Sequence, residues 1–242
     1  AGLRSFRKSM PEEVNRLLTD HLSELLFAPT RTAVENLARE GITAGVHMVG
    51  DIMADTTRQT LERPCTVERP PGTYLLLTMH RAENTDDPAR LRCVLDTLDG
   101  QPEPVVFPCH PRTRAVLERQ AWQPRGSVRL RSPVSHRETL ELARYARLVL
   151  TDSGGLQKEA YLVGTPCLTL REETEWVETV AAGWNRLVGV RSDAIRSALN
   201  HFTPPAERPP LYGDGRTSER ILDLLAQWQV EHGRNPLMTK GA

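Results

Sequence analysis

Short apolar runs alternate with segments of helical spacing along most of the chain. The apolar runs, each about the length of one buried strand, cover residues 73–80, 105–110, 128–132, 148–151, 167–171 and 187–190. The helical segments between and after them cover residues 88–98, 113–120, 137–146, 156–163, 175–182 and 193–202. Strict alternation of continuous apolar strands with helices predicts a parallel sheet covered on both faces, and therefore a doubly wound α/β domain of the nucleotide-binding type.

The beginning of the chain predicts only part of another domain. Pro11 opens a helix, and the apolar face of that helix is formed by Val14, Leu17, Leu18, His21, Leu22 and Leu25. A short apolar run at 26–29, a helix at 32–40 and a strand at 46–49 follow. Two strands and two helices cannot close a core alone. We therefore expect this segment either to pack on the main domain or to belong to a partner domain whose beginning is absent.

The chain divides into three segments where its composition changes. Residues 51–61 predict a linker helix, and the proline-rich residues 62–72 mark a boundary. After the alternating region, residues 204–214 predict an irregular connection and residues 217–230 a final amphipathic helix. We expect an N-terminal remainder with its linker helix at 1–62, a nucleotide-binding domain at 63–205, and a C-terminal connection and helix at 206–242.

Composition and charge exclude several classes of protein. The 242 residues are 39% hydrophobic and 26% charged, which is typical of a globular chain, and no apolar run approaches the roughly 18 residues that a membrane helix needs. Acidic residues are interleaved with basic ones and the formal net charge is zero, so we expect neither nucleic acid nor a membrane as a partner. The four cysteines are far apart, which predicts free thiols, with Cys93 and Cys109 buried as small apolar residues.

A strand that runs through a short polar turn into a helix predicts an anion site. Ser153, Gly154 and Gly155 follow the apolar run 148–151 and open the next helix. Bare backbone N–H groups and the helix dipole favour a phosphate there. Glu159 lies four residues beyond Gly155, about 6 Å further along the same helical face, where it could bind ribose hydroxyls. The alternative is an ordinary helix cap with a solvent-exposed glutamate.

Two further turns carry histidine and arginine at the carboxyl ends of predicted strands, where doubly wound sheets place ligands. His80 and Arg81 leave the first strand of the main domain and suit proton transfer and the pairing of phosphate. His110 leaves the next strand, either as a site residue or as the cap of a helix that begins at Pro111. No histidine pair stands at metal-ligand spacing with a carboxylate, so we predict no metal site.

Seven motifs occur in a fixed order along the chain. They are residues 80–85, 110–114, 151–159, 164–166, 170–178, 183–189 and 212–215. Together they resemble the non-hydrolysing UDP-N-acetylglucosamine 2-epimerases over the whole chain. The resemblance implies Rossmann-like domains in the glycosyltransferase-B arrangement, with a complete C-terminal UDP-binding domain. It also implies a partial N-terminal domain, because residues 1–4 look like the continuation of the family's Glu-Ala-Gly-Leu-Arg motif.

The resemblance implies a reaction and a set of residues. The reaction converts UDP-N-acetylglucosamine to UDP-N-acetylmannosamine by eliminating UDP and adding it back, with no metal or redox cofactor. Glu12 and His80 would be catalytic. The residues expected to bind the UDP-sugar are Arg81, Glu83, Asn84, His110, Val134, Thr139, Ser153, Gly154, Gly155, Glu159 and Arg171. The resemblance further implies a cytoplasmic protein of cell-surface polysaccharide biosynthesis that forms a homodimer at full length.

The chain departs from the family pattern in two places. Trp176 and Val177 stand where many relatives have Arg-Pro, so a cationic contact there would have to come from Arg171. His136 and Thr139 stand where relatives place aromatic residues, in the loop expected to meet the uracil through backbone groups. Two alternatives stay open, a UDP-sugar glycosyltransferase of the same architecture and a nucleotide-binding fragment without catalysis. We expect the chain alone to bind UDP and to epimerise negligibly.

Overall fold

A computed structural model describes residues 1–8 and 10–232 and divides the chain into two compact units. The smaller unit combines residues 1–58 with the segment that starts at Pro210, and the larger unit is Gln59–Pro209. The first boundary falls inside helix α3 (Ile52–Glu62), four residues before the predicted boundary at 62. The last turn of this helix thus belongs to the larger unit. No helix among the described residues is both long and apolar enough to cross a membrane.

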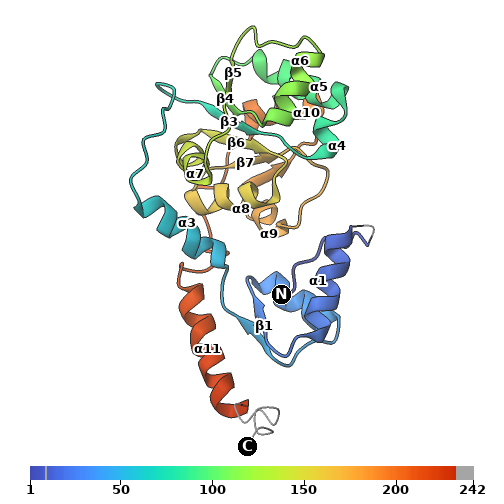
Figure 1. Ribbon diagram of the computed structural model, residues 1–242, viewed down its shortest axis with the longest axis vertical. Helices are drawn as coiled ribbons and strands as arrows, with labels where there is room; N and C mark the ends of the chain where they lie inside the picture. The colour runs from blue at the N-terminus through green and yellow to red at the C-terminus, as the bar shows by residue number, and fades with distance from the viewer. Residues whose placement is uncertain (9, 233–242) are drawn as a thin grey trace, which may run out of the picture. The chain divides into compact units, whose positions relative to one another are not determined.

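The larger unit is built on a parallel sheet. Its strands are β3 (Leu75–Thr78), β4 (Val105–Pro108), β5 (Val128–Arg131), β6 (Leu148–Thr151), β7 (Cys167–Thr169) and β8 (Asn185–Leu187). Within the described residues they form one six-stranded sheet in the order β5-β4-β3-β6-β7-β8, and every neighbouring pair is parallel (Figure 1). This order confirms the predicted doubly wound fold, and the strand order reverses between the adjacent strands β3 and β6.

Helices cover both faces of this sheet because successive strand residues point to opposite sides. The helices are α5 (Pro88–Asp99), α6 (Pro111–Arg119), α7 (His136–Tyr145), α8 (Gly154–Val163) and α10 (Ser192–His201). Leu75 and Leu77 of β3 pack in one apolar cluster with residues of α5, α6 and α10. Tyr74 and Leu76 pack in a second cluster with residues of α7 and α8. The two clusters form the core on the two sides of the sheet.

Strand β8 begins two residues before the predicted apolar run at 187–190. Its first residue, Asn185, is 3% exposed and pairs in register with Cys167 of β7. The Asn185 amide accepts a hydrogen bond from the Thr169 hydroxyl at 2.8 Å and donates to Thr179 and Gln157 at 3.1 and 3.2 Å. A polar residue therefore lies inside the strand, because its side chain is satisfied by three buried partners.

The smaller unit joins segments from both ends of the chain. Strands β1 (Leu26–Ala28) and β2 (Val46–Met48) pair in parallel. The same unit contains helices α1 (Pro11–Leu22), α2 (Arg31–Arg39) and α11 (Thr217–His232). The Asp55 carboxylate of α3 accepts hydrogen bonds from the backbone N–H groups of Thr217 and Ser218 at 3.0 and 2.8 Å. Burial opposes ionisation of Asp55, but these bonds lower its pKa below the usual range. Asp55 thereby anchors the start of α11 to α3.

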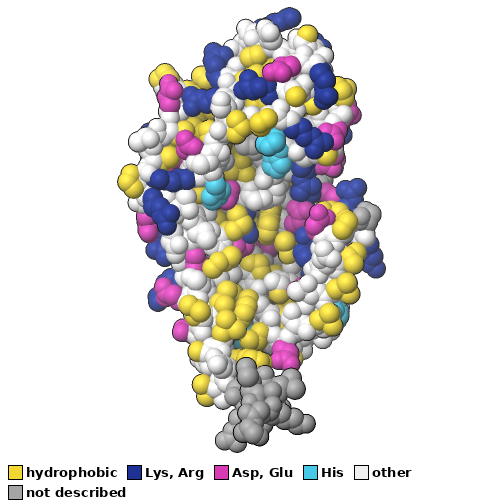
Figure 2. All heavy atoms as spheres, viewed as in Figure 1, with side chains coloured by type: hydrophobic (Ala, Val, Ile, Leu, Met, Phe, Trp, Pro, Cys, Tyr) yellow, Lys and Arg dark blue, Asp and Glu magenta, His cyan; other side chains and the backbone are white. Residues whose placement is uncertain are grey.

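Helix α1 turns the opposite face inward from the one that its apolar pattern predicts. Val14, Leu18 and Leu22 are 42%, 58% and 84% exposed, and yellow side chains run along this helix in Figure 2. The buried residues of α1 are instead Glu13 and Asp20. They face the polar segment before the helix, where the Arg4 guanidinium, with its side chain 1% exposed, pairs with Asp20 at 2.7 Å. Within the described residues, the buried side of α1 is therefore the one that carries paired charges.

The cysteines are free thiols among the described residues. Cys109 is buried as predicted, and burial raises the pKa of its thiol to about 11. Cys93 is half-buried, which corrects the prediction, because its position on α5 lies at the margin of the apolar face. Cys167 is also buried, and its pKa is raised to about 12 by burial. The buried thiols at 109 and 167 are thus poor nucleophiles.

Candidate functional site

The carboxyl ends of β3 and β6 meet at the point where the strand order reverses. The hydroxyls of Thr78 and Thr151, the last residues of these strands, lie 2.7 Å apart. The Thr151 hydroxyl also accepts a hydrogen bond from the backbone N–H of Ser153 at 2.9 Å. The crevice beside such a reversal is where doubly wound sheets bind their ligands. The motifs that begin at His80 and Ser153 therefore leave the sheet side by side.

A buried carboxylate holds these two turns together. Asp152, which follows β6, is 0% exposed and accepts hydrogen bonds from the backbone N–H groups of His80 and Arg81. It also accepts one from the Asn84 amide at 3.1 Å. The His80 ring nitrogen Nδ1 lies 3.7 Å from Asp152 Oδ1. Asp152 was not among the predicted site residues, although its place at the end of an apolar strand, just before Ser153, was a signal for such an anchor.

A cavity of about 260 Å³ opens at these strand ends. Its lining consists of Thr78, Met79, His80, Pro108, His110, Pro133, Val134, His136, Thr139, Ser153, Leu156 and Glu159. The lining thus brings together the predicted residues His80, His110, Val134, Thr139, Ser153 and Glu159. The lining combines apolar surface with histidine, hydroxyl and carboxylate groups, as expected of a small-molecule site.

Gly155, in the first turn of α8, is a glycine at a position where the backbone and the neighbouring atoms would also accept a larger residue. Ser153 caps the helix, and its hydroxyl accepts a hydrogen bond from the Leu156 N–H at 3.4 Å. A Cβ atom on Gly155 would come no closer than 3.9 Å to a neighbouring heavy atom, the Ser153 hydroxyl. Because neither crowding nor a positive φ at Gly155 demands glycine, the open backbone at this helix start is available to an anionic ligand.

Glu159 lies on α8 one turn after this helix start, within the same cavity. Its carboxylate Oε1 is 2.6 Å from Nε2 of His136, the first residue of α7. The side chain of Glu159 is 10% exposed and that of His136 is 58% exposed. The predicted spacing between an anion site and a carboxylate is therefore present, and a histidine that the sequence prediction did not include binds the carboxylate.

His110 caps a helix, as one of its two interpretations predicted, and it also lies at the cavity. Its ring nitrogen Nδ1 accepts a hydrogen bond from the Arg112 N–H at 3.3 Å, so it caps α6. The same side chain lines the cavity. Since Nδ1 accepts, the neutral ring carries its proton on Nε2, which is then free to donate to a ligand.

Six predicted contact residues do not line the cavity, namely Arg81, Glu83, Asn84, Gly154, Gly155 and Arg171. The first three belong to the segment that follows β3. Arg81 caps the short helix α4 (Ala82–Thr85), and Glu83 is exposed on that helix. Asn84 is 0% exposed, and its amide donates to Asp152 and to the Leu170 carbonyl while accepting from Arg90. Within the described residues the Asn84 side chain is thus engaged in holding the loop after β3.

Arg171, which was expected to supply a cationic contact, is paired with a carboxylate. It is 3% exposed, and its guanidinium donates to both oxygens of Glu175 at 3.0 and 3.2 Å. Burial opposes the charge of Glu175, but these bonds, with the nearby Arg81 guanidinium, lower its pKa below the usual range. Arg171 therefore neutralises Glu175 and does not supply a free cation. Trp176, which follows, donates from its indole nitrogen to the Gly154 carbonyl at 2.6 Å.

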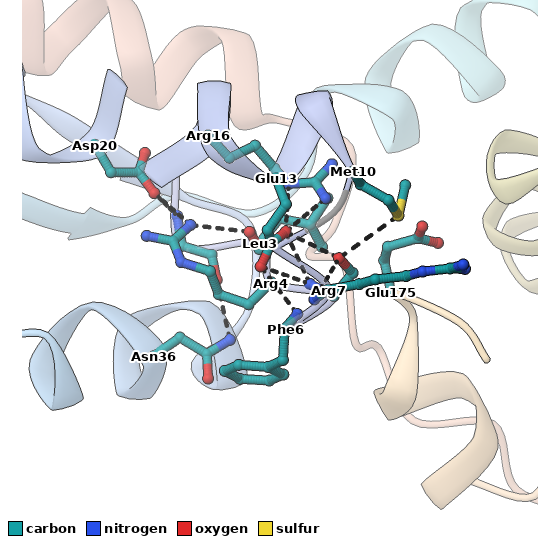
Figure 3. A network of polar contacts seen from close by, with 12 residues as sticks. Leu3, Arg4, Phe6, Arg7, Met10, Glu13, Arg16, Asp20, Asn36 and Glu175 are labelled. Atoms are coloured by element: carbon teal, nitrogen blue, oxygen red, sulfur yellow. Dashed lines mark hydrogen bonds and ion pairs between the residues drawn. The ribbon is translucent and has the colours of Figure 1, made fainter. Parts of the chain in front are cut away.

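The smaller unit carries the other predicted catalytic residue, Glu12. It is exposed in the first turn of α1. The next residue, Glu13, is 1% exposed and accepts hydrogen bonds from the backbone N–H groups of Ser5 and Phe6 (Figure 3). It also accepts from Arg16 at 2.7 Å. Burial opposes its charge, but this set of donors lowers the pKa of Glu13. Glu13 thus fixes the loop in which Phe6 has the unusual φ of +59°.

Comparisons with known proteins place this architecture in one family. The family model for UDP-N-acetylglucosamine 2-epimerase matches residues 1–226. A UDP-N-acetylglucosamine 2-epimerase homolog of Methanococcus maripaludis is 42% identical over 93% of this chain and 67% of the relative. A UDP-2,3-diacetamido-2,3-dideoxy-D-glucuronate 2-epimerase of Pseudomonas aeruginosa is 45% identical over 94% of this chain and 66% of the relative. The chain thus spans about two thirds of the length of these relatives.

A solved structure agrees with these sequence relatives. The crystal structure of Methanocaldococcus jannaschii UDP-GlcNAc 2-epimerase in complex with UDP-GlcNAc and UDP superposes with a TM-score of 0.81 at 37% identity. The superposed region is 94% of this chain and 67% of the Methanocaldococcus chain. The chain belongs to the UDP-N-acetylglucosamine 2-epimerase family.

Proposed function

We propose that this chain supplies the UDP-binding domain and part of the catalytic groups of an enzyme that interconverts UDP-N-acetylglucosamine and UDP-N-acetylmannosamine. The observation that carries the proposal is the cavity at the reversal of strand order, with a capped helix start and a carboxylate one turn later. Backbone N–H groups at Ser153, Gly154 and Gly155 would bind the diphosphate, and Glu159 would bind the ribose. The loop at Val134 and Thr139 would meet the uracil.

The reaction explains why such a site is needed. A base removes the C2 proton, the C1–O bond breaks, and UDP leaves with the bonding electrons to give a 2-acetamidoglucal. UDP then adds back at C1 while C2 gains a proton on the opposite face. The C2 proton becomes acidic only as positive charge develops at C1, so the site must stabilise the departing diphosphate at the same time. The start of α8 provides that stabilisation by its dipole.

His80 and Glu12 have separate proposed roles. His80 lines the cavity beside the phosphate site, and its backbone is held by Asp152, so it is suited to contact the leaving UDP. Glu12 is exposed in the first turn of α1, next to the loop that Glu13 fixes. We assign it to the reacting sugar, as a base or as a stabiliser of developing positive charge. Arg81, which lies near Glu175, adds positive potential at the same strand end.

The substrate can be tested directly against the two activities named for the relatives. The full protein is incubated in heavy water with UDP-N-acetylglucosamine, and deuterium at C2 is followed by NMR. We expect exchange at C2 together with formation of the manno epimer. A parallel incubation with UDP-2,3-diacetamido-2,3-dideoxy-D-glucuronate, the substrate named for the Pseudomonas relative, measures substrate choice. Absence of exchange with both nucleotides would refute the proposal.

A glycosyltransferase of the same architecture would use the same UDP site for another reaction. It would transfer the sugar to an acceptor and leave the C2 proton in place. Release of UDP only when a sugar acceptor is added, without deuterium at C2, would favour that function. Exchange at C2 without any acceptor favours epimerisation.

A further inference from the structure

The bond between His136 and Glu159 connects two helices across the proposed ribose site. His136 is the first residue of α7, and Glu159 is the sixth residue of α8. Both side chains line the same cavity. Their atoms Nε2 and Oε1 are 2.6 Å apart, a short contact of the kind expected when the acceptor is a carboxylate. The pair is therefore part of the site and not an incidental surface contact.

The chemistry of the two groups fixes the direction of this bond. An ionised carboxylate only accepts, so His136 must carry a proton on Nε2 and donate it. One carboxylate oxygen is thereby occupied, and Oε2 remains to accept from a ligand. The backbone that carries His136 is held in turn, because the Ser135 hydroxyl and the Glu138 carboxylate form a capping box at the start of α7.

We infer that His136 is a positioning residue for nucleotide recognition, which holds Glu159 so that its free oxygen accepts from the ribose hydroxyls of a uridine diphosphate. This inference rests on the proposed function and adds to it a residue and a source of selectivity. A glutamate side chain left free must lose rotamer freedom when a ligand binds. His136 removes that freedom beforehand, so the gain in affinity depends on the presence of ribose hydroxyls.

The test compares two nucleotides that differ only at the ribose. Binding of UDP and of 2′,3′-dideoxy-UDP is measured by titration calorimetry for the wild-type chain and for His136→Leu. We expect UDP affinity to fall about tenfold in His136→Leu, which corresponds to about 1.4 kcal/mol. Affinity for the dideoxy nucleotide should stay within about twofold of the wild-type value, because Glu159 then has no hydroxyl to bind.

Two further variants separate positioning from a general effect on folding. His136→Gln keeps an N–H donor that can reach Glu159, so it should restore most of the affinity for UDP. His201→Leu changes another exposed histidine, at the end of α10 and outside the cavity, and should leave both affinities unchanged.

The possible outcomes are distinct. Equal losses for both nucleotides in His136→Leu would mean that the ring supports the base, the phosphate or the fold, and would overturn the inference. Tighter UDP binding in His136→Leu would also overturn it, because the histidine would then compete with ribose for the carboxylate. Failure of the wild-type chain to bind UDP at all would count against the proposed function itself.

Discussion

The carboxylate of Asp152 accepts the backbone N–H of His80, with 3.2 Å from the nitrogen to each of its two oxygens. The two residues are 72 positions apart in the sequence. His80 follows β3 and Asp152 follows β6, and these two strands are neighbours in the sheet. The position of the proposed leaving-group histidine is thus set by the strand that also carries the phosphate site.

Replacement of this anchor should affect both stability and rate. In Asp152→Asn, one end of the side chain becomes an amide donor that faces the N–H groups of His80 and Arg81, which leaves a buried donor unsatisfied. We expect a loss of about 1–3 kcal/mol in the free energy of unfolding, measured by urea titration, and slower exchange at C2. Asp193→Asn, at an exposed carboxylate of α10, is the matched control. Unchanged stability in both variants would contradict the structural role of Asp152.

A methyl group at the start of α8 should separate stability from binding. Gly155→Ala adds a Cβ that meets no heavy atom within 3.9 Å, and alanine favours a helix by up to about 1 kcal/mol over glycine. We expect the thermal midpoint to stay equal or rise while UDP affinity falls about tenfold or more, because the methyl group occupies space that the phosphate needs. Gly100→Ala, at the open end of α5, should leave UDP affinity unchanged. Unaltered UDP affinity in Gly155→Ala would remove the phosphate from this helix start.

Glu12 and His80 should differ in what their loss changes. A carboxylate that acts on the developing cation contributes mainly in the transition state, so Glu12→Gln should slow C2 exchange by about 10²–10⁴-fold with UDP affinity nearly intact. His80→Ala should reduce both, because a group that contacts the diphosphate is felt in both states. NMR exchange rates and calorimetric titrations of the full protein provide the comparison, with exposed Glu24→Gln as control. Parallel losses of rate and affinity in Glu12→Gln would make Glu12 a structural residue of the first helical turn.

The bonds to Glu13 predict how acid affects the loop at Ser5 and Phe6. Since the pKa of Glu13 is lower in the folded chain than its ordinary value of 4.5, the ionised carboxylate stabilises the loop fully above that pH. This stabilisation is lost as the pH falls through the folded pKa. We expect the protection factors of the Ser5 and Phe6 amides, measured by NMR hydrogen exchange, to decrease below about pH 4.5 in the wild type. In Glu13→Gln they should be lower and nearly independent of pH over the same range.

The sequence was sufficient for the larger unit because its strands are continuous apolar runs. Period and length identify such runs directly, and the ends of parallel strands bring their motifs to one edge. Five of the predicted contact residues and the predicted catalytic His80 therefore line one cavity. The short helix α4 was not predicted, since its four residues contain no helical period and depend on the bonds that Asp152 and Asn84 make.

The apolar pattern could not show which charged residues pair in the fold. The apolar side of α1 is exposed among the described residues, and its buried side carries Asp20, which pairs with Arg4. Arg4 also pairs with Glu40. Arg171 was expected to supply a cationic contact because Trp176 and Val177 stand where many relatives have Arg-Pro. Its partner Glu175 lies only four residues away, but the burial of both became apparent only in the fold. The role of His136 depends on a contact across 23 residues.

The bond from Asp55 to the start of α11 has a consequence for biosynthesis. The two residues it joins are more than 160 positions apart, and the whole larger unit is translated between them. Chains are synthesised from the N-terminus, and domains fold as units as they leave the ribosome. The larger unit is continuous and can form on the nascent chain. The hydrogen bonds to Asp55 can form only after Thr217 and Ser218 have been synthesised. The smaller unit therefore reaches its final form last.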